Sequence, residues 1–138
     1  MKNSSKVVLV VEDNKSSMKL FHALLDAYGY NVLQATNGMD GWQMAREHRP
    51  NVIIMDIRLP DISGLEVIKR LKEDETLKLI PVIVVTAFDM KGDQEKFLDG
   101  GCDGYISKPI SITKFLQTLE RVVAEQAPSS TECELETA

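Results

Sequence analysis

Five short segments of the chain are rich in apolar residues and are separated by longer segments with helical spacing. Three of the five are unbroken runs of mostly β-branched residues, at residues 7–11, 52–55 and 82–85. They lack the alternation of apolar and polar positions that a half-exposed strand shows, so they are typical of strands buried on both faces. Residues 31–35 are more polar and predict an edge strand, and residues 105–106 are a weaker candidate.

The segments between the strands place apolar residues three and four positions apart, which is the spacing of one helix face. This spacing predicts four helices, over residues 15–28, 38–48, 63–71 and 112–123. The first is expected to align Met18, Phe21, Leu25 and Tyr28 on one face, and the last to align Ile112, Phe115, Leu119 and Val122. Ser63 and Glu66 have the spacing of a capping box at the start of the third helix.

Residues 87–101 have fewer apolar positions and contain Gly92, which predicts a helix of modest stability that ends at Gly100 or Gly101. Strand and helix then alternate five times, which is the signature of an α/β fold whose parallel strands are joined by right-handed crossovers. Residues 125–138 lack periodicity. We therefore expect one domain over residues 1–124, followed by a disordered tail.

Composition and charge narrow the classes of function. The 138 residues carry a net charge of −5, with 43% apolar and 27% charged residues, as in an ordinary soluble domain. A negative net charge argues against binding to nucleic acid or an anionic membrane through a broad basic surface. Cys102 and Cys133 form no spaced ligand set, and no apolar run approaches the ~20 residues of a membrane span. With no signal-peptide pattern at the start of the chain, we expect a cytoplasmic protein.

Candidate functional residues follow four of the predicted strands. Glu12 and Asp13 come after the first strand, Asp56 after the third, and Thr86 and Lys108 close the fourth and fifth. Because ligands of an open parallel sheet bind beyond the carboxyl ends of its strands, we expect these side chains to converge. Like charges ~4 Å apart repel by about 4 kcal/mol at an effective dielectric of about 20, so a compensating cation is expected. Oxygen ligands favour Mg²⁺.

The central carboxylate then has a chemical role available to it. A carboxylate can attack phosphorus as a nucleophile and form an acyl phosphate, which makes Asp56 the candidate acceptor of a phosphoryl group. Phosphoryl transfer needs mainly positioning and neutralisation of charge. The metal, Lys108 and the Thr86 hydroxyl can supply both.

Taken together, the motifs resemble those of response-regulator receiver domains, the phospho-acceptor half of two-component signalling. The matching stretches are VEDN at residues 11–14, MDIRLPDISG at 55–64, VTA at 85–87 and SKP at 107–109. The resemblance covers roughly residues 6–124. It implies a flavodoxin-like (βα)5 fold, a doubly wound parallel sheet of five strands in the order 2-1-3-4-5.

The resemblance also implies the composition of the site. Asp56 is implied to be the phosphorylated residue in a Mg²⁺-dependent reaction. Glu12, Asp13, Asp56 and the backbone carbonyl of Arg58 are implied to belong to the metal site. The protein would be a signalling switch and not an enzyme with an external substrate, although it takes part in its own phosphorylation and autodephosphorylation.

Further roles at the other strand ends come from the same resemblance. Thr86 and Lys108 are implied to bind the phosphoryl group, Thr86 and Tyr105 to form the activation switch, and Lys108–Pro109 to be a cis peptide. The implied phosphodonor is a sensor histidine kinase or a histidine phosphotransfer protein. Downstream proteins are implied to bind the face formed by the fourth helix, the fifth strand and the fifth helix.

A narrower resemblance is to the DivK-type single-domain regulators, which act in the control of cell division and polarity. The stretches that carry it are MKLFHALLDAYGY at residues 18–30, TAFDMKGDQEKF at 86–97 and GGCDGYISKPIS at 100–111. No output domain is expected after residue 124, so we expect the signal to leave through protein contacts and not through DNA binding by this chain.

Two alternative functions use parts of the same residue set. A phosphatase of the haloacid-dehalogenase type also has a nucleophilic aspartate at a strand end and a magnesium ion. Such enzymes place an acid–base aspartate two residues after the nucleophile, and this position is Arg58 here. The second alternative is a pseudo-receiver scaffold that works without phosphorylation, against which the intact set of Glu12, Asp13, Asp56 and Lys108 argues.

Overall fold

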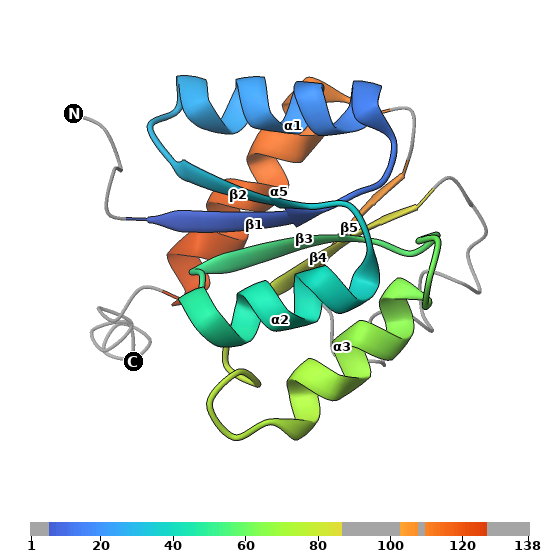
Figure 1. The fold of residues 1–138 in the computed structure, drawn as a ribbon. Coiled ribbons are helices and arrows are strands. Elements are labelled where there is room, and N and C mark those ends of the chain that lie inside the picture. Colours follow the sequence, from blue (N-terminus) through green and yellow to red (C-terminus); the bar gives the residue numbers. More distant parts are fainter. Residues whose placement is uncertain (1–5, 87–102, 108–109, 127–138) are drawn as a thin grey trace, which may run out of the picture.

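The computed structural model describes residues 6–86, 103–107 and 110–126, and shows a parallel sheet between two layers of helices (Figure 1). The strands are β1 (Val7–Val11), β2 (Asn31–Ala35), β3 (Val52–Asp56), β4 (Val82–Thr86) and β5 (Gly104–Ser107). The helices are α1 (Lys15–Ala27), α2 (Gly38–His48), α3 (Gly64–Glu73) and α5 (Ile112–Gln126). None of the described helices is long and apolar enough to span a bilayer.

The order of the strands is β2-β1-β3-β4-β5, and all four pairings are parallel. This confirms the predicted doubly wound sheet with a flavodoxin-like fold. The chain leaves β1 toward β2 on one side and later returns to pair β3 with β1 on the other side. The carboxyl ends of β1 and β3 therefore flank the topological switch point, where open α/β sheets bind their ligands.

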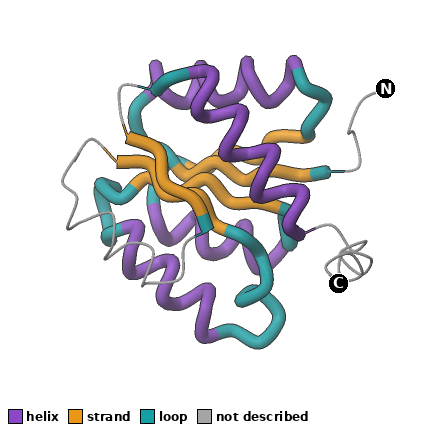
Figure 2. Tube along the Cα trace, turned by 180° about the vertical axis from the view of Figure 1, so that it is seen from behind, coloured by secondary structure: helices purple, strands orange, loops and turns teal. Residues whose placement is uncertain are grey.

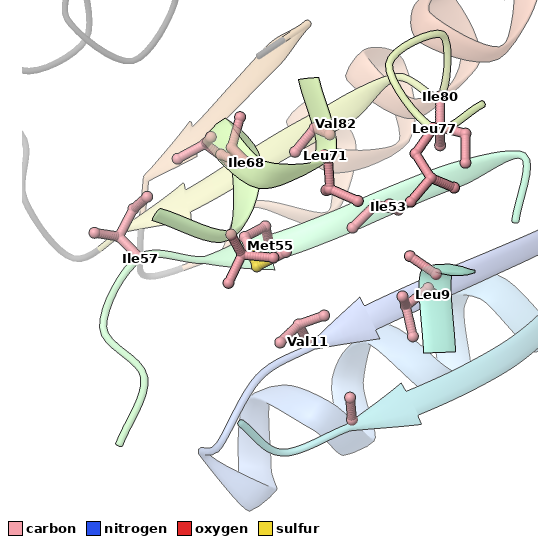
Figure 3. Packing of buried hydrophobic residues seen from close by; sticks show 14 residues of the cluster. Leu9, Val11, Ile53, Met55, Ile57, Ile68, Leu71, Leu77, Ile80 and Val82 are labelled. Carbon is pink, nitrogen blue, oxygen red and sulfur yellow. The ribbon is translucent and has the colours of Figure 1, made fainter. Parts of the chain in front are cut away.

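Both faces of the sheet are covered, which explains the unbroken apolar runs. Alternate residues of β1 and β3 point to α2 and α3, where Leu9, Val11, Ile53 and Met55 belong to one buried cluster (Figure 3). The residues between them join residues of α1 and α5 in a second cluster on the opposite face. Figure 2 shows the backbone of the molecule from behind. In this second cluster, Phe21 and Phe115 are fully buried, with ring centroids 5.2 Å apart.

β2 is an edge strand, as predicted, with exposed or half-buried residues at its first four positions. The start of α3 is also confirmed, because the Ser63 side chain caps the helix and accepts a hydrogen bond from the Leu65 N–H at 3.1 Å. Glu66 lies 3.6 Å from the Arg70 guanidinium, one turn along the helix. Local sequence signals therefore define this helix start correctly.

Two residues of the predicted apolar faces are not core residues. Tyr28 is 47% exposed, because α1 ends at Ala27 and Tyr28 is its C-cap. Tyr30 is buried instead, and its burial, with the negative charge of Glu120 nearby, raises its pKa above the usual 10.0. Ile112 is 50% exposed, because it is the first residue of α5 and the buried face of that helix begins at Phe115.

The predicted bounds otherwise differ little from the observed ones. Helix α5 continues to Gln126, past the predicted end at residue 123. The helix predicted over residues 87–101 and the tail from residue 127 lie outside the described residues, so the division into a domain of residues 1–124 and a disordered tail remains a prediction.

The difference between Phe115 and Ile112 predicts different costs of truncation on the same helix. Phe115→Ala should lower the free energy of unfolding by about 3–5 kcal/mol, because it leaves a cavity between α5 and the sheet. Ile112→Ala should cost less than about 1 kcal/mol, because half of that side chain is already in water. Urea denaturation followed by far-UV circular dichroism measures both, and equal losses would contradict the assigned core.

Candidate functional site

Three acidic residues meet at the carboxyl edge of the sheet. Glu12 and Asp13 follow β1, and Asp56 is the last residue of β3, the neighbouring strand. One carboxylate oxygen from each of the three lies within 4.8 Å of the other two. The switch point therefore brings Asp13 close to Asp56, which lies 43 positions later in the sequence, as the predicted strand ends indicated.

The backbone fixes Glu12 at this edge. Its N–H donates to the carbonyl oxygen of Ala35 at 3.0 Å, which extends the pairing of β1 with β2 by one residue. Its side chain is 1% exposed, and Oε2 accepts a hydrogen bond from the Asn14 N–H at 3.1 Å. The Asn14 side chain in turn caps α1 by accepting from the Ser17 N–H at 2.9 Å. Helix α1 thus starts from the same turn that holds the Glu12 carboxylate inward.

Asp56 is 4% exposed, and the backbone of the turn that follows it is fixed by hydrogen bonds. Its Oδ1 lies 3.4 Å from the Arg58 N–H, a long and therefore weak hydrogen bond. The next residue, Ile57, donates its N–H to the Val85 carbonyl at 3.1 Å and accepts from the Gly64 N–H at 2.9 Å. A Cβ atom at Gly64 would overlap the Asp56 carbonyl oxygen, so α3 can begin this close to β3 only with glycine.

The donor set fits a hard divalent cation. It consists of oxygen atoms only, and Mg²⁺ is commonly held by one or a few carboxylates and by water. Glu12 and Asp56 are both buried, and burying like charges together is costly unless a cation compensates them. Asp13 is exposed and leaves one side of the cluster open to solvent. The three residues therefore suit an ion that is reached from solvent.

A shallow pocket of about 240 Å³ adjoins the acidic cluster. Glu12 and Asp13 line it together with Lys15 and Lys19 from α1 and Gln34 from β2. The lysines place positive charge beside the carboxylates on the side of β2.

The remaining predicted site residues are only partly described. Thr86 ends β4, where it pairs with Ser107 of β5, and its side chain lies outside the described residues. Tyr105 pairs with Val84, is half-buried, and packs against the core cluster on the α2 and α3 side. The roles of both residues in a switch remain predictions.

Three other features of the site remain predictions. Lys108 and Pro109, including the predicted cis peptide, lie outside the described residues. Arg58 is exposed, and the role of its backbone carbonyl as a metal ligand also stays a prediction.

One residue of the site region was missed by the sequence analysis. Asp61, five residues after Asp56, accepts hydrogen bonds from the backbone N–H groups of Gly38 at 2.7 Å and Met39 at 2.9 Å, at the start of α2. Burial would raise the pKa of Asp61, but the N–H groups of Met39, Gly38 and the loop itself outweigh it and hold that pKa below the usual 3.8. The turn sequence around Pro60 gave no sign of this contact, because its partners lie 22 and 23 residues upstream.

Known proteins with similar sequences agree with this geometry. The sequence profile described as the response regulator receiver domain matches residues 8–120. The polar-differentiation response regulator DivK of Brucella anthropi is 52% identical over 120 residues, which are 87% of this chain and 98% of that protein. DivK of Brucella ovis is 51% identical over 121 residues, which are 88% of this chain and 98% of that protein.

Solved structures of similar fold belong to the same class. The receiver domain of the sensor histidine kinase PA1611 from Pseudomonas aeruginosa, which has magnesium coordinated in its active-site cleft, is 29% identical with a TM-score of 0.79, over 86% of this chain and 98% of that one. The chemotaxis response regulator CheY4 of Vibrio cholerae is 28% identical with a TM-score of 0.80, over 85% and 98% of the two chains. The chain therefore belongs to the response regulator receiver domain family, with a phospho-acceptor signalling role, and is homologous to the DivK single-domain regulators.

Proposed function

We propose that Asp56 accepts a phosphoryl group from a phosphohistidine of a sensor kinase or histidine phosphotransfer protein, with Mg²⁺ held by Glu12, Asp13 and Asp56. The observation that carries this proposal is the approach of three carboxylate oxygens to within 4.8 Å at the switch point of the sheet. The backbone carbonyl of Arg58 is proposed as a further ligand. When bound, Mg²⁺ would neutralise charge on the carboxylates and on the incoming phosphoryl oxygens.

In the proposed transfer, a carboxylate oxygen of Asp56 attacks phosphorus and forms an O–P bond. The P–N bond to the donor histidine breaks, and its electron pair returns to the imidazole nitrogen. Autodephosphorylation reverses the modification when water attacks phosphorus and the Asp56 carboxylate leaves. The buried position of Asp56 limits the access of water, while the exposed side at Asp13 lets a donor approach.

The proposed output is a change in protein contacts. A phosphoryl group adds close to two negative charges and three acceptor oxygens at the end of β3. Thr86 and Lys108 would bind these oxygens, and Tyr105 would turn inward as Thr86 moves. Support for this switch comes from the family resemblance and from the half-buried position of Tyr105 in β5, in register with the residue two positions before Thr86. Downstream partners would then read the face formed by the fourth helix, β5 and α5.

Homology to the polar-differentiation response regulator DivK of Brucella species favours a role in polar differentiation, and the family resemblance extends this to division control. The haloacid-dehalogenase alternative is weakened by Arg58, which occupies the position where those phosphatases have an acid–base aspartate. A pseudo-receiver is disfavoured by the complete acidic cluster. A cytoplasmic location remains a prediction.

Removal of the acceptor carboxylate should abolish phosphorylation. Asp56→Asn should gain no phosphoryl group from a small-molecule phosphodonor with Mg²⁺, because the amide is not a nucleophile toward phosphorus. Intact-mass spectrometry measures the added group. Asp26→Asn, which makes the same change at an exposed position of α1, should be labelled like the wild type. Labelling of Asp56→Asn at the wild-type rate would refute Asp56 as the acceptor.

The acidic cluster should lower the free energy of unfolding in the absence of Mg²⁺ and should make the protein more stable when Mg²⁺ binds. Without Mg²⁺, Asp13→Asn should raise the free energy of unfolding by a few tenths to about 1 kcal/mol, because it removes a charge repelled by Glu12 and Asp56. With Mg²⁺ at about 100 times its Kd, the wild type should gain ~2.7 kcal/mol and Asp13→Asn less than half of that.

Thermal or urea unfolding with and without Mg²⁺ measures these two effects. The matched control is Glu120→Gln, which removes an exposed negative charge from α5 and should keep the full response to Mg²⁺. An Asp13→Asn variant that is stabilised by Mg²⁺ as strongly as the wild type would place the ion elsewhere.

A further inference from the structure

The loop between β3 and α3, residues 57–63, is tied to the start of α2 by one carboxylate. Asp61 accepts the N–H groups of Gly38 at 2.7 Å and Met39 at 2.9 Å. The next N–H groups of α2 are satisfied locally, since Asp40 donates to the Asn37 side chain at 2.8 Å and Gly41 to the Asn37 carbonyl at 3.1 Å. The Asn37 side chain bonds the third N–H of the helix, so Asp61 completes the cap from another part of the chain by accepting from the first two.

Close packing at Gly38 also holds the loop against the start of α2. A Cβ atom at Gly38 would lie 2.6 Å from Cγ1 of Ile62, closer than real Cβ atoms approach a neighbour, and 3.2 Å from Oδ1 of Asp61, which is a tight contact. Ile62 packs against the core cluster on this face of the sheet. The loop is thus pressed on α2 by its apolar side chain and held there by the Asp61 carboxylate. Glycine at position 38 is what permits this approach.

Asp61 lies only five positions along the chain from Asp56 of the acidic cluster. Asp56 begins the turn, Ile57 is held to β4 by its N–H, and Gly64 closes the loop against Ile57. Between these anchors, the two hydrogen bonds that Asp61 accepts tie the loop to α2. Arg58, whose carbonyl is the proposed metal ligand, lies within the segment whose course these anchors determine.

We propose that Asp61 is a positioning residue for the metal site, which holds the loop so that the Arg58 carbonyl faces the ion bound by Glu12, Asp13 and Asp56. This inference rests on the proposed function. The contact of Asp61 with α2 and the binding of Mg²⁺ are thermodynamically linked. If the contact favours Mg²⁺ binding, then Mg²⁺ binding must favour the contact by the same factor. The α2 start should therefore become more ordered when the site is loaded.

The test compares Mg²⁺ affinity among variants by isothermal titration calorimetry. Asp61→Ala should weaken Mg²⁺ binding about 10-fold, within the range seen when residues behind metal ligands are removed. Asp61→Asn keeps one acceptor oxygen and should lose less. Gly38→Ala displaces the loop without any change in charge, so a loss of affinity in this variant separates positioning from the simple removal of a negative charge near a cation.

A matched control exists at the opposite edge of the sheet. Asp74 also caps backbone groups, accepting from the Thr76 N–H at 2.8 Å and the Leu77 N–H at 3.2 Å, and its pKa is likewise lowered, first by the Thr76 hydroxyl. Asp74→Ala should cost a similar amount of thermal stability and leave Mg²⁺ affinity within about twofold of the wild type.

A second readout does not depend on affinity. In the wild type, saturating Mg²⁺ should slow hydrogen exchange of the Gly38 and Met39 amides severalfold, as measured by NMR. This effect should be reduced in Asp61→Asn and absent in Asp61→Ala. Wild-type affinity in both Asp61→Ala and Gly38→Ala would overturn the inference, as would an equal loss of affinity in Asp74→Ala. A wild-type protein that neither binds Mg²⁺ nor becomes phosphorylated would instead overturn the proposed function, and this inference with it.

Discussion

Repulsion between buried carboxylates is the constraint on which the functional edge of this protein depends. Glu12 and Asp56 are almost fully buried, and an oxygen of each lies within 4.8 Å of the other and of Asp13. At such distances one pair of like charges costs on the order of 4 kcal/mol at an effective dielectric of about 20, comparable with the net gain from burying two large apolar side chains. The fold must therefore keep these carboxylates close together despite their repulsion, until a cation binds to them or Asp56 is phosphorylated.

The sheet meets this constraint because its central strands are anchored on both sides. β1 lies between β2 and β3, and β3 lies between β1 and β4, so the acidic residues extend from the most completely paired part of the sheet. Hydrogen bonds continue past the strand ends, from the Glu12 N–H to Ala35 and from the Ile57 N–H to Val85. The two core clusters cover both faces of these strands, which lie between the two layers of helices (Figure 1), and Figure 3 shows the cluster on the α2 and α3 side. Displacing the backbone that carries one of these carboxylates would therefore require breaking strand pairing and core packing together.

The parts of this arrangement that sequence reasoning could predict are those with local or periodic signals. Unbroken β-branched runs indicated strands buried on both faces, and acidic residues at two strand ends indicated a shared edge. The strand order came from resemblance to a family, because apolar runs alone do not say which strands are neighbours. Tyr28 and Ile112 were assigned to buried faces because spacing continues past the residue where a helix leaves or has not yet reached the sheet.

Asp61 shows why the rest of the site could not be read in the same way. Its partners are the first two N–H groups of α2, and backbone groups leave no mark in a sequence. What the sequence does contain is the glycine at position 38, whose requirement becomes clear only when Ile62 is seen against it. Gly64 has the same character, because the oxygen that excludes a side chain there belongs to the backbone of Asp56. In the sequence, such close approaches are indicated only by glycines that no turn explains. The distances in the fold are needed to identify the neighbouring atoms for which each glycine leaves room.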